Sequence, residues 1–594
     1  MIPDSMRKEG KGIWNDKRII GLIIDDEGSE YAKDLIKDAA EALPQDDSAR
    51  LIVLAGKHYN PDDPDKNLQE YKRVYNMLHR LEETCAFDGL LVSYGAFADV
   101  LMHAGEEGSD SHLLDIPMVF VGEGPKWGII CGCDNEIGIR SAIDFLVKIN
   151  GCRKMCMLGG REDQADAIVR KKVFRQSLID NGLEYKEQYF VATDMSDNCV
   201  SEAELLLDMN PDVEAVFCVN DSVARAMYKA LKKRGLMPGK DVQVFGFDNT
   251  RGASIMEPPL SSVGTEGATA GRKIMELLLQ KLDGEEVDSV CLPTRLYGRE
   301  SLKYATYDYS TVELITADEA FIYRMFNDCF YRYGNVRHTR ESVDLKRLFY
   351  EIMSRVLNAM RSRYMSVEEF NELLLLVDIF IENGVMEYTD TRKFIKCIDL
   401  LQEAINQTAR SKSVNSMINR VFLRAKDKII IELSRQNEAD AIKWEASRKR
   451  IERFCLSTID YIGMSQADSE RIIRNIEGIG LKNAAFYMFD SPVVCGKGQA
   501  ADFPESIRLR CVVKDGTFYT ISRDRQRGLL KEMFSREELT AMDRAFLVLP
   551  VLCGSYIYGF LACGLEEDIF DKGVMLSTEL GRALYLDEIS ARSI

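Results

Sequence analysis

Short runs of mainly apolar residues, repeated along residues 17–303, constrain the fold of this chain more than any other feature. They lack the polar alternation of a half-exposed strand and are typical of strands buried on both faces of a parallel sheet. The runs are RIIGLII, RLIVLAG, FDGLLVS, PMVFVGE, RKMCMLGG, EAVFCVN and VQVFGF. Helical patterns lie between them, at residues 31–43, 136–149, 170–181, 222–234 and 269–282. This alternation predicts an α/β fold with two doubly wound lobes.

A second pattern begins after residue 303. Residues 304–460 have helical spacing throughout, and two positions have the sequence of a capping box. Thr316 is followed by Glu319, and Ser366 by Glu369, so each serine or threonine is expected to cap a helix. We therefore predict a helical linker or bundle in this segment.

The last predicted helix of this segment allows two arrangements. Val414, Ile418, Val421 and Ala425 recur at helical spacing, and a highly charged stretch follows them. The same spacing suits a coiled-coil dimer and a helix packed on its own bundle, and the sequence favours neither.

Strands return in residues 461–594. The run AFLVLPVLCGSYIYGFLACG predicts a hairpin that turns at Gly554 and Ser555, and residues 572–590 predict a final helix. A small α+β module of the sensor or dimerisation type is expected here. Residues 1–16 are expected to form a disordered N-terminus.

The composition excludes several classes of protein. A net charge of −18 and a pI near 5.1 argue against a large surface for nucleic acid, which needs lysine and arginine. Fifteen cysteines lie scattered in apolar runs, with only five histidines, so we expect buried thiols and no metal site. The apolar run at residues 19–24 is too short for a signal peptide, and no run could span a membrane. A cytoplasmic protein is predicted.

Several segments of residues 17–303 resemble the lactose/galactose repressor (LacI/GalR) family, in the order in which that family has them. They include FDGLLVSYG, CDNEIGIRSAIDFLVKINGCRKMCMLGG, VEAVFCVNDSVARAMYKALKKRGLMPGKDVQVFGFDN and the closing CLPTRLYGRES. The resemblance covers about 285 residues. It implies the two-lobed, type I periplasmic-binding-protein-like fold of that family's effector-binding domain, without its helix-turn-helix.

The resemblance also implies a ligand site at strand ends that face a cleft between the lobes. The implied ligand-binding residues are Arg170, Asn220, Asp248, Ser93, Asp25, Asp26 and Tyr31. Arg170 corresponds to an arginine that grips sugar hydroxyls, and Tyr31 to an aromatic residue that stacks on a sugar face. Carboxylate, amide and guanidinium groups can each bind two hydroxyls, and an aromatic ring covers the C–H face of a sugar.

Four of these residues also have a purely structural interpretation. Arg170 begins a run of three basic residues and could form a surface ion pair, and Asn220 could cap the next helix. Asp248 and Asn249 could form an Asx turn, and Tyr31 could pack in the core.

Two departures from the family pattern matter. Only sixteen residues precede the first predicted strand, so we expect no direct DNA binding from this chain. Gly122 occupies a strand-end position where the family often has a ligand-binding acid.

Residues 461–594 resemble a GAF domain more weakly. Regulators of this layout usually continue into a GGDEF or AraC-type output domain, so we expect either an output domain or partner in trans or a longer natural chain.

We therefore predict a non-enzymatic, cytoplasmic, ligand-sensing regulator without a cofactor. A small polar effector, a sugar or a derivative, would bind between the lobes, and lobe closure would act on the helical and GAF-like modules of a homodimer. The alternatives are a dimerisation scaffold that has lost ligand binding and a solute-binding protein.

Overall fold

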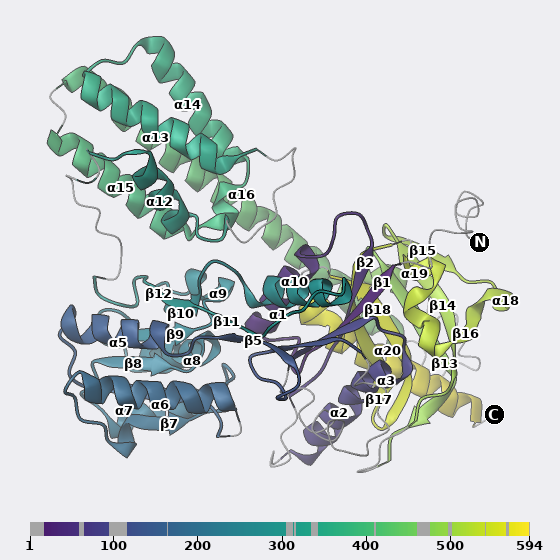
Figure 1. The fold of residues 1–594 in the computed structure, drawn as a ribbon. Helices are drawn as coiled ribbons and strands as arrows, with labels where there is room; N and C mark the ends of the chain where they lie inside the picture. The colour runs from purple at the N-terminus through teal and green to yellow at the C-terminus, as the bar shows by residue number, and fades with distance from the viewer. Residues whose placement is uncertain are drawn as a thin grey trace. The chain divides into compact units, whose positions relative to one another are not determined.

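The computed structural model forms two compact units, each built from separated parts of the chain. Unit 1 comprises residues 1–133, 269–292 and 443–594, and unit 2 comprises residues 134–268 and 293–442. The structure describes residues 17–58, 65–93, 116–162, 164–304, 313, 316–333, 343–408, 411–459, 474, 476–496, 502–540, 542–565 and 569–592. Figure 1 labels most of the helices and strands of the two units.

Unit 1 contains one sheet of twelve strands. Its strands are β1 (Arg18–Ile23), β2 (Ala49–Leu54), β3 (Gly89–Ser93), β4 (Met118–Val121), β5 (Ile129–Cys133), β11 (Val290–Leu292), β13 (Ala484–Val494), β14 (Ser506–Lys514), β15 (Thr517–Thr520), β16 (Arg527–Leu529), β17 (Ala545–Cys553) and β18 (Tyr556–Gly564). The strand order is β11-β5-β4-β3-β1-β2-β17-β18-β13-β14-β15, and β16 pairs with β14. The first six strands are parallel, as the continuous apolar runs predicted.

The helices of unit 1 connect and cover these strands. They are α1 (Glu30–Glu41), α2 (Lys66–Asn76), α3 (Leu81–Thr84), α10 (Ala270–Leu282), α18 (Arg523–Gln526), α19 (Glu537–Thr540) and α20 (Ile569–Arg592). The Ser29 hydroxyl accepts a hydrogen bond from the backbone N–H of Ala32 and so caps α1. Gly271 of α10 lies against the backbone of α1, where a Cβ would meet the Leu35 carbonyl oxygen at 2.3 Å. That glycine permits the close packing of the two helices.

In unit 1, β2 pairs with β17, a strand of the predicted C-terminal module. The strands run parallel, with Leu51 opposite Ala545 and Leu54 opposite Val548. The buried guanidinium of Arg50 donates hydrogen bonds to the carbonyl oxygens of Asp543 at 2.8 Å and Leu539 at 3.4 Å. The predicted separate module at residues 461–594 therefore extends the sheet of the first lobe.

Unit 2 begins with a six-stranded sheet. Its strands are β6 (Met155–Gly159), β7 (Phe190–Ala192), β8 (Ala215–Cys218), β9 (Gln243–Phe247), β10 (Ser261–Thr265) and β12 (Thr294–Tyr297), in the order β12-β10-β9-β8-β6-β7. Its helices are α5 (Ile137–Lys148), α6 (Ala165–Asp180), α7 (Val200–Met209), α8 (Asp221–Lys233) and α9 (Arg251–Ile255). All pairs are parallel except β10 with β12. The core of this lobe includes the stacked rings of Phe217 and Phe245.

A helical bundle completes unit 2. Its helices are α12 (Glu319–Cys329), α13 (Leu345–Ser362), α14 (Val367–Glu382), α15 (Thr391–Thr408) and α16 (Lys412–Ile459), which continues past the unit boundary at residue 442. Phe330 is buried at the bundle centre, with ring centroids 5.0–5.7 Å from those of Phe349, Phe380 and Phe394. This aromatic cluster gives the bundle a core of its own.

Capping-box spacing predicted two helix starts, and one of the two is observed. Ser366 and Glu369 form the predicted capping box at the start of α14. The prediction for Thr316 is wrong, because α12 begins at Glu319 and is capped by the side chain of Asp318. Asp318 stands directly before the helix, where its carboxylate reaches the Phe321 N–H.

The apolar positions of α16 pack within this chain. Val414, Ile418, Val421 and Ala425 are all buried in the bundle core. The intramolecular alternative is therefore the one observed for these four residues.

Of the fifteen cysteines, eleven are buried and Cys291 is exposed. Among the residues that the structure describes, no helix is long and apolar enough to cross a membrane.

Candidate functional site

A strained turn follows β9. Asp248 and Asn249 have φ angles of 95° and 49°, a left-handed region that residues other than glycine seldom adopt. The turn is held by hydrogen bonds from the Asp248 N–H to the Val263 carbonyl at 2.8 Å and from the Asn249 N–H to the Ser262 hydroxyl at 3.0 Å. Such strain is often found at functional sites, where the surrounding structure maintains it.

Arg170 is the central cation of this strand-end region. It is only 5 % exposed and lies on the buried face of α6, so the predicted alternative of a surface ion pair is wrong. Its guanidinium donates to the Asn135 Oδ1 at 2.9 Å and to the Val219 carbonyl at 2.8 Å. The same group lies 3.5 Å from the centroid of the Phe247 ring. These contacts fix the orientation of the guanidinium in advance of any ligand.

Asp248 lies beside this guanidinium. Its Oδ1 is 3.7 Å from the Arg170 Nη1, which is too far for a hydrogen bond and near enough for an ion pair. Burial raises the pKa of Asp248 to about 6, although Arg170 lowers it. The structure thus brings two of the predicted ligand-binding residues together as one donor and one acceptor.

Asn220 has a structural role in the same region. Its Oδ1 accepts from the Val223 N–H at 2.8 Å, which caps α8, and its Nδ2 donates to the Met195 carbonyl at 3.1 Å. Both ends of the amide are therefore engaged by the protein. The capping alternative describes Asn220, and its implied contact with an effector stays a prediction.

Sequence reasoning missed Asp221, the residue next to it. Its buried carboxylate accepts hydrogen bonds from the Ser262 hydroxyl at 2.6 Å and the Thr250 N–H at 2.8 Å. Burial and the nearby Asp248 carboxylate raise the pKa of Asp221 to about 7, in spite of these hydrogen bonds. An acid at the first position of a helix is ordinary in sequence, so only the fold reveals its burial.

The predicted residues of the first lobe lie in unit 1. Ser93 ends β3, and its hydroxyl donates to the Asp25 Oδ1 at 3.3 Å. Asp26 accepts from the Gly28 N–H at 3.2 Å within its own turn. Tyr31 is 40 % exposed, so the alternative of core packing is wrong for it. The structure thus brings Ser93 and Asp25 together.

Glu27 is a second acid that the sequence did not single out. It is 1 % exposed, and its Oε1 lies 2.8 Å from the Lys57 Nζ and accepts from the Tyr75 hydroxyl at 3.1 Å. Burial raises its pKa, although Lys57 lowers it. The only sequence signal for Glu27 was its place at the end of a run of three acids, directly after Asp25 and Asp26.

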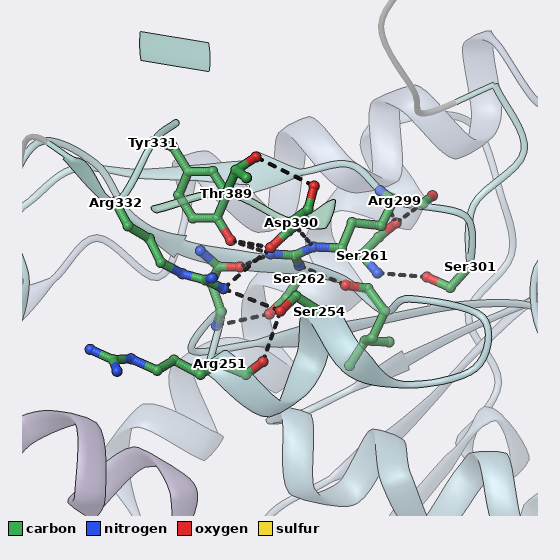
Figure 2. A network of polar contacts seen from close by, with 12 residues as sticks. Arg251, Ser254, Ser261, Ser262, Arg299, Ser301, Tyr331, Arg332, Thr389 and Asp390 are labelled. Atoms are coloured by element: carbon green, nitrogen blue, oxygen red, sulfur yellow. Dashed lines mark hydrogen bonds and ion pairs between the residues drawn. The ribbon is translucent and has the colours of Figure 1, made fainter. Parts of the chain in front are cut away.

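A network of polar side chains leads from the strained turn to the bundle of unit 2. Figure 2 shows its centre, the buried Arg299, which follows β12. Its Nη2 donates to the Asn249 Oδ1 at 2.6 Å, its Nη1 to the Leu260 carbonyl at 2.7 Å, and its Nε to the Asp390 Oδ2 at 2.6 Å. Asp390 directly precedes α15. A single guanidinium therefore links the turn after β9 to a helix of the bundle.

The side chains of Tyr331 and Arg332 also contact Asp390 (Figure 2). The Tyr331 hydroxyl donates to its Oδ1 at 2.8 Å, and the Arg332 Nη2 lies 3.3 Å from the same atom. Burial alone would raise the pKa of Asp390, but the charges of Arg299 and Arg332 lower it to about 2. The carboxylate is thus ionised at every pH at which the protein is expected to work.

Comparison with known proteins identifies the region that carries these side chains. Residues 144–302 match the family model described as a periplasmic binding protein-like domain. The chain contains a periplasmic binding protein-like domain. Arg170, Asp248 and Arg299 all lie within the matched residues of that domain.

Curated relatives of the domain are transcriptional regulators. The HTH-type transcriptional regulator CelR of Thermobifida fusca is 33 % identical over 171 residues, which are 28 % of this chain and 50 % of that protein. The repressor PurR of Vibrio atlanticus is 28 % identical over 222 residues, 36 % of this chain and 64 % of the relative. Catabolite control protein A of Priestia megaterium is 29 % identical over 174 residues, 29 % and 52 % of the two chains. The chain thus spans half to under two thirds of the length of these relatives.

Solved structures of the same kind also align with about half of this chain. The CelR–cellobiose complex has a TM-score of 0.38 at 22 % identity and covers 48 % of this chain and 86 % of its own. A sugar-binding regulator of the LacI family from Enterococcus faecalis has a TM-score of 0.38 at 22 % identity, with 49 % and 99 % covered.

The glycine that departs from the family pattern has a backbone explanation. Gly122 follows β4 with a φ angle of 77°, and its N–H donates to the Cys131 carbonyl at 2.9 Å. An acid at this position would adopt a left-handed conformation at a cost. The glycine therefore fits the turn.

The strand-end region of unit 2 places a cation beside a carboxylate. A fixed guanidinium beside a carboxylate offers several donors and acceptors to a polar molecule. Among the described residues, no group of three or more histidine, cysteine, aspartate or glutamate side chains could hold a metal ion.

Proposed function

We propose that this protein is a ligand-sensing regulator of transcription or signalling. The matched periplasmic binding protein-like domain supports this proposal, together with relatives that are transcriptional regulators. The pair of buried Arg170 and half-buried Asp248, with 3.7 Å between Nη1 and Oδ1, is the observation that carries it. This distance is too long for a direct hydrogen bond, so a ligand hydroxyl that bridges the two groups could accept from Arg170 and donate to Asp248.

The proposed effector is a small, neutral, hydroxyl-rich molecule such as a sugar. The guanidinium of Arg170 can donate to one hydroxyl, and the Asp248 carboxylate can accept from the same or a neighbouring one. A sugar also fits the solved relative that is described as a cellobiose complex.

The proposed output passes through the helical bundle. An effector that contacts Asp248 changes the energy of the strained turn, and the adjacent Asn249 is held by Arg299. Because Arg299 also holds Asp390 before α15, a shift of the turn alters the anchoring of the bundle. The GAF-like residues 461–594 and a homodimer would carry the signal further.

Thermal unfolding of the full chain tests the proposal. The panel contains cellobiose, common monosaccharides and nucleosides, and an effector at about one hundred times its Kd should stabilise the fold by about 2.7 kcal/mol. Asp248→Asn and Arg170→Met should abolish this shift. Lys172→Met is the matched control, because Lys172 lies on the exposed side of the same helix. The proposal fails if no compound shifts the wild-type transition, or if the shift survives in both site variants.

A further inference from the structure

Unit 2 contains a cavity of about 240 Å³ that the proposed effector site does not include. One wall is formed by residues 295–300, at the end of β12 and directly after it. The opposite wall is formed by Asp390 and the first two turns of α15. The volume is small beside the roughly 300–1,000 Å³ of drug-sized sites, so it suits a molecule no larger than a monosaccharide phosphate.

Cations outnumber acids around this cavity. Arg295, Arg299, Arg392, Lys393 and Lys396 line it, against three carboxylates from Glu300, Asp328 and Asp390. This balance is the reverse of that of the whole chain, whose net charge is −18. A positively charged cavity in an acidic protein favours an anionic ligand.

The arginines have carboxylate partners already. Arg299 pairs with Asp390 at 2.6 Å. Arg392 lies 2.8 Å from Glu300 and also reaches Glu257, and Arg295 lies 3.8 Å from Asp328 and 3.6 Å from Glu266. The two lysines, Lys393 and Lys396, add positive charge to that of these paired arginines.

Both lysines lie at the N-terminal end of α15. Arg392, Lys393 and Lys396 lie in the first six residues of the helix, where its dipole favours negative charge. Lys396 lies three residues after Lys393 and four after Arg392, spacings at which like charges on a helix repel each other. The first turn of α15 contains no acid, and Asp390 stands directly before it. An anion in the cavity would be attracted by these cations and by the helix dipole, because helix N-termini and lysines together bind phosphate well.

Two observations add to this argument. The Nε of Arg295 is buried and has no hydrogen-bond partner among the residues that the structure describes. Burial lowers the pKa of Lys393 to about 8, although the Asp390 carboxylate raises it. An anion would offer an acceptor to the first group and would restore the full charge of the second.

We propose that this cavity is a second ligand site, which binds a small phosphate ester between the end of β12 and the start of α15. The phosphate group lies at the first turns of α15 with Lys393 and Lys396. The remainder of the molecule occupies the space beside Arg295. This cavity shares no lining residue with the effector site at Arg170 and Asp248.

Calorimetric titration of the full chain tests this site with ribose 5-phosphate as the probe, and with ribose and citrate as comparisons. Ribose 5-phosphate should bind, whereas ribose should not. The Lys393→Met/Lys396→Met variant should bind at least about tenfold more weakly. Lys412→Met is the control, since Lys412 begins the neighbouring helix α16 outside the cavity and should leave the affinity unchanged.

A second measurement does not depend on the variants. At pH 8, Lys393 is about half protonated, so phosphate binding should take up protons, seen as a dependence of the heat on buffer ionisation enthalpy. The proposal is overturned if ribose 5-phosphate does not bind at millimolar concentration, or if binding takes up no protons. Unchanged affinity in the double lysine variant, or binding of citrate in preference to the phosphate ester, would overturn it too.

Discussion

Arg299 and Asp390 form a buried ion pair, with 2.6 Å between the arginine Nε and the aspartate Oδ2. One residue follows the last strand of the second lobe, and the other precedes a helix of the bundle. Removing charges from water is costly, and hydrogen bonds to Asn249, Leu260 and Tyr331 offset that cost here. The pair therefore fastens two parts of unit 2 that are 91 residues apart in sequence.

Loss of this pair should destabilise unit 2 strongly. Asp390→Asn leaves the Arg299 guanidinium buried without its counter-charge, so the free energy of unfolding should fall by about 3–5 kcal/mol. Urea unfolding followed by circular dichroism measures this loss. Glu372→Gln is the control, because it breaks an exposed pair with Arg355 that should contribute less than about 1 kcal/mol. Equal effects of the two substitutions would show that burial adds nothing to the Arg299 pair.

The buried carboxylate of Asp221 should make stability depend on pH. Its folded pKa of about 7 lies above its unfolded value of 3.8, so the folded state binds more protons between these values. The contribution of Asp221 to stability is therefore largest below pH 4 and is lost as the pH rises to 7, at about 1.4 kcal/mol for each pH unit.

Asp221→Asn should remove most of this dependence. The difference in unfolding free energy between the wild type and the variant should then shift in favour of the variant from pH 5 to pH 7. Urea titrations at a series of pH values measure it. A difference that stays constant over this range would contradict the raised pKa.

Asn220 should contribute to stability as a helix cap. Asn220→Ala removes the hydrogen bond to the Val223 N–H and should cost about 1 kcal/mol, whereas Asn220→Asp should keep the cap. The midpoints of urea unfolding compare the two variants. A capping role predicts that any effector found for the wild type still stabilises Asn220→Ala by the same amount. Loss of that stabilisation would instead show that the Asn220 amide contacts the effector.

The aromatic cluster of the bundle should be sensitive to truncation. Phe330→Ala leaves a cavity among Phe349, Phe380 and Phe394 and should cost about 3–5 kcal/mol. Leu423→Ala, on the exposed side of α16, should change stability by less than about 0.5 kcal/mol. Thermal unfolding of both variants checks the contrast. If Phe330→Ala lowers the stability only slightly, the bundle repacks around the gap and the prediction is wrong.

Apolar continuity was enough to predict seven of the buried strands. The strand that ends at Phe247 was predicted correctly, because a fully buried strand leaves a clear sequence pattern. β10 was missed because its sequence SSVGT has two buried serines that look like loop residues. Those serines are satisfied by hydrogen bonds to residues far along the chain, which no local pattern contains.

The site was predicted less completely, for a similar reason. Arg170 seemed to belong to a run of three basic residues, yet Val173, Phe174 and Ser177 place it on the buried face of α6 at helical spacing. This helical spacing was visible in the sequence. The pairing of Arg299 with Asp390 could not be predicted from the sequence, because each is a single charged residue and only the fold brings them together.

The pairing of β2 with β17 has a consequence for synthesis on the ribosome. About 490 residues separate the two strands, so at about 5–20 residues per second β2 emerges roughly 25–100 s before its neighbour. Throughout that interval the sequence ARLIVL has an open edge, the kind of edge that recruits strands from other chains. Nascent chains of this protein should therefore need protection by chaperones until residue 553 has emerged. Fragments that stop before residue 545 should aggregate through that edge, even when every residue of the first lobe is present.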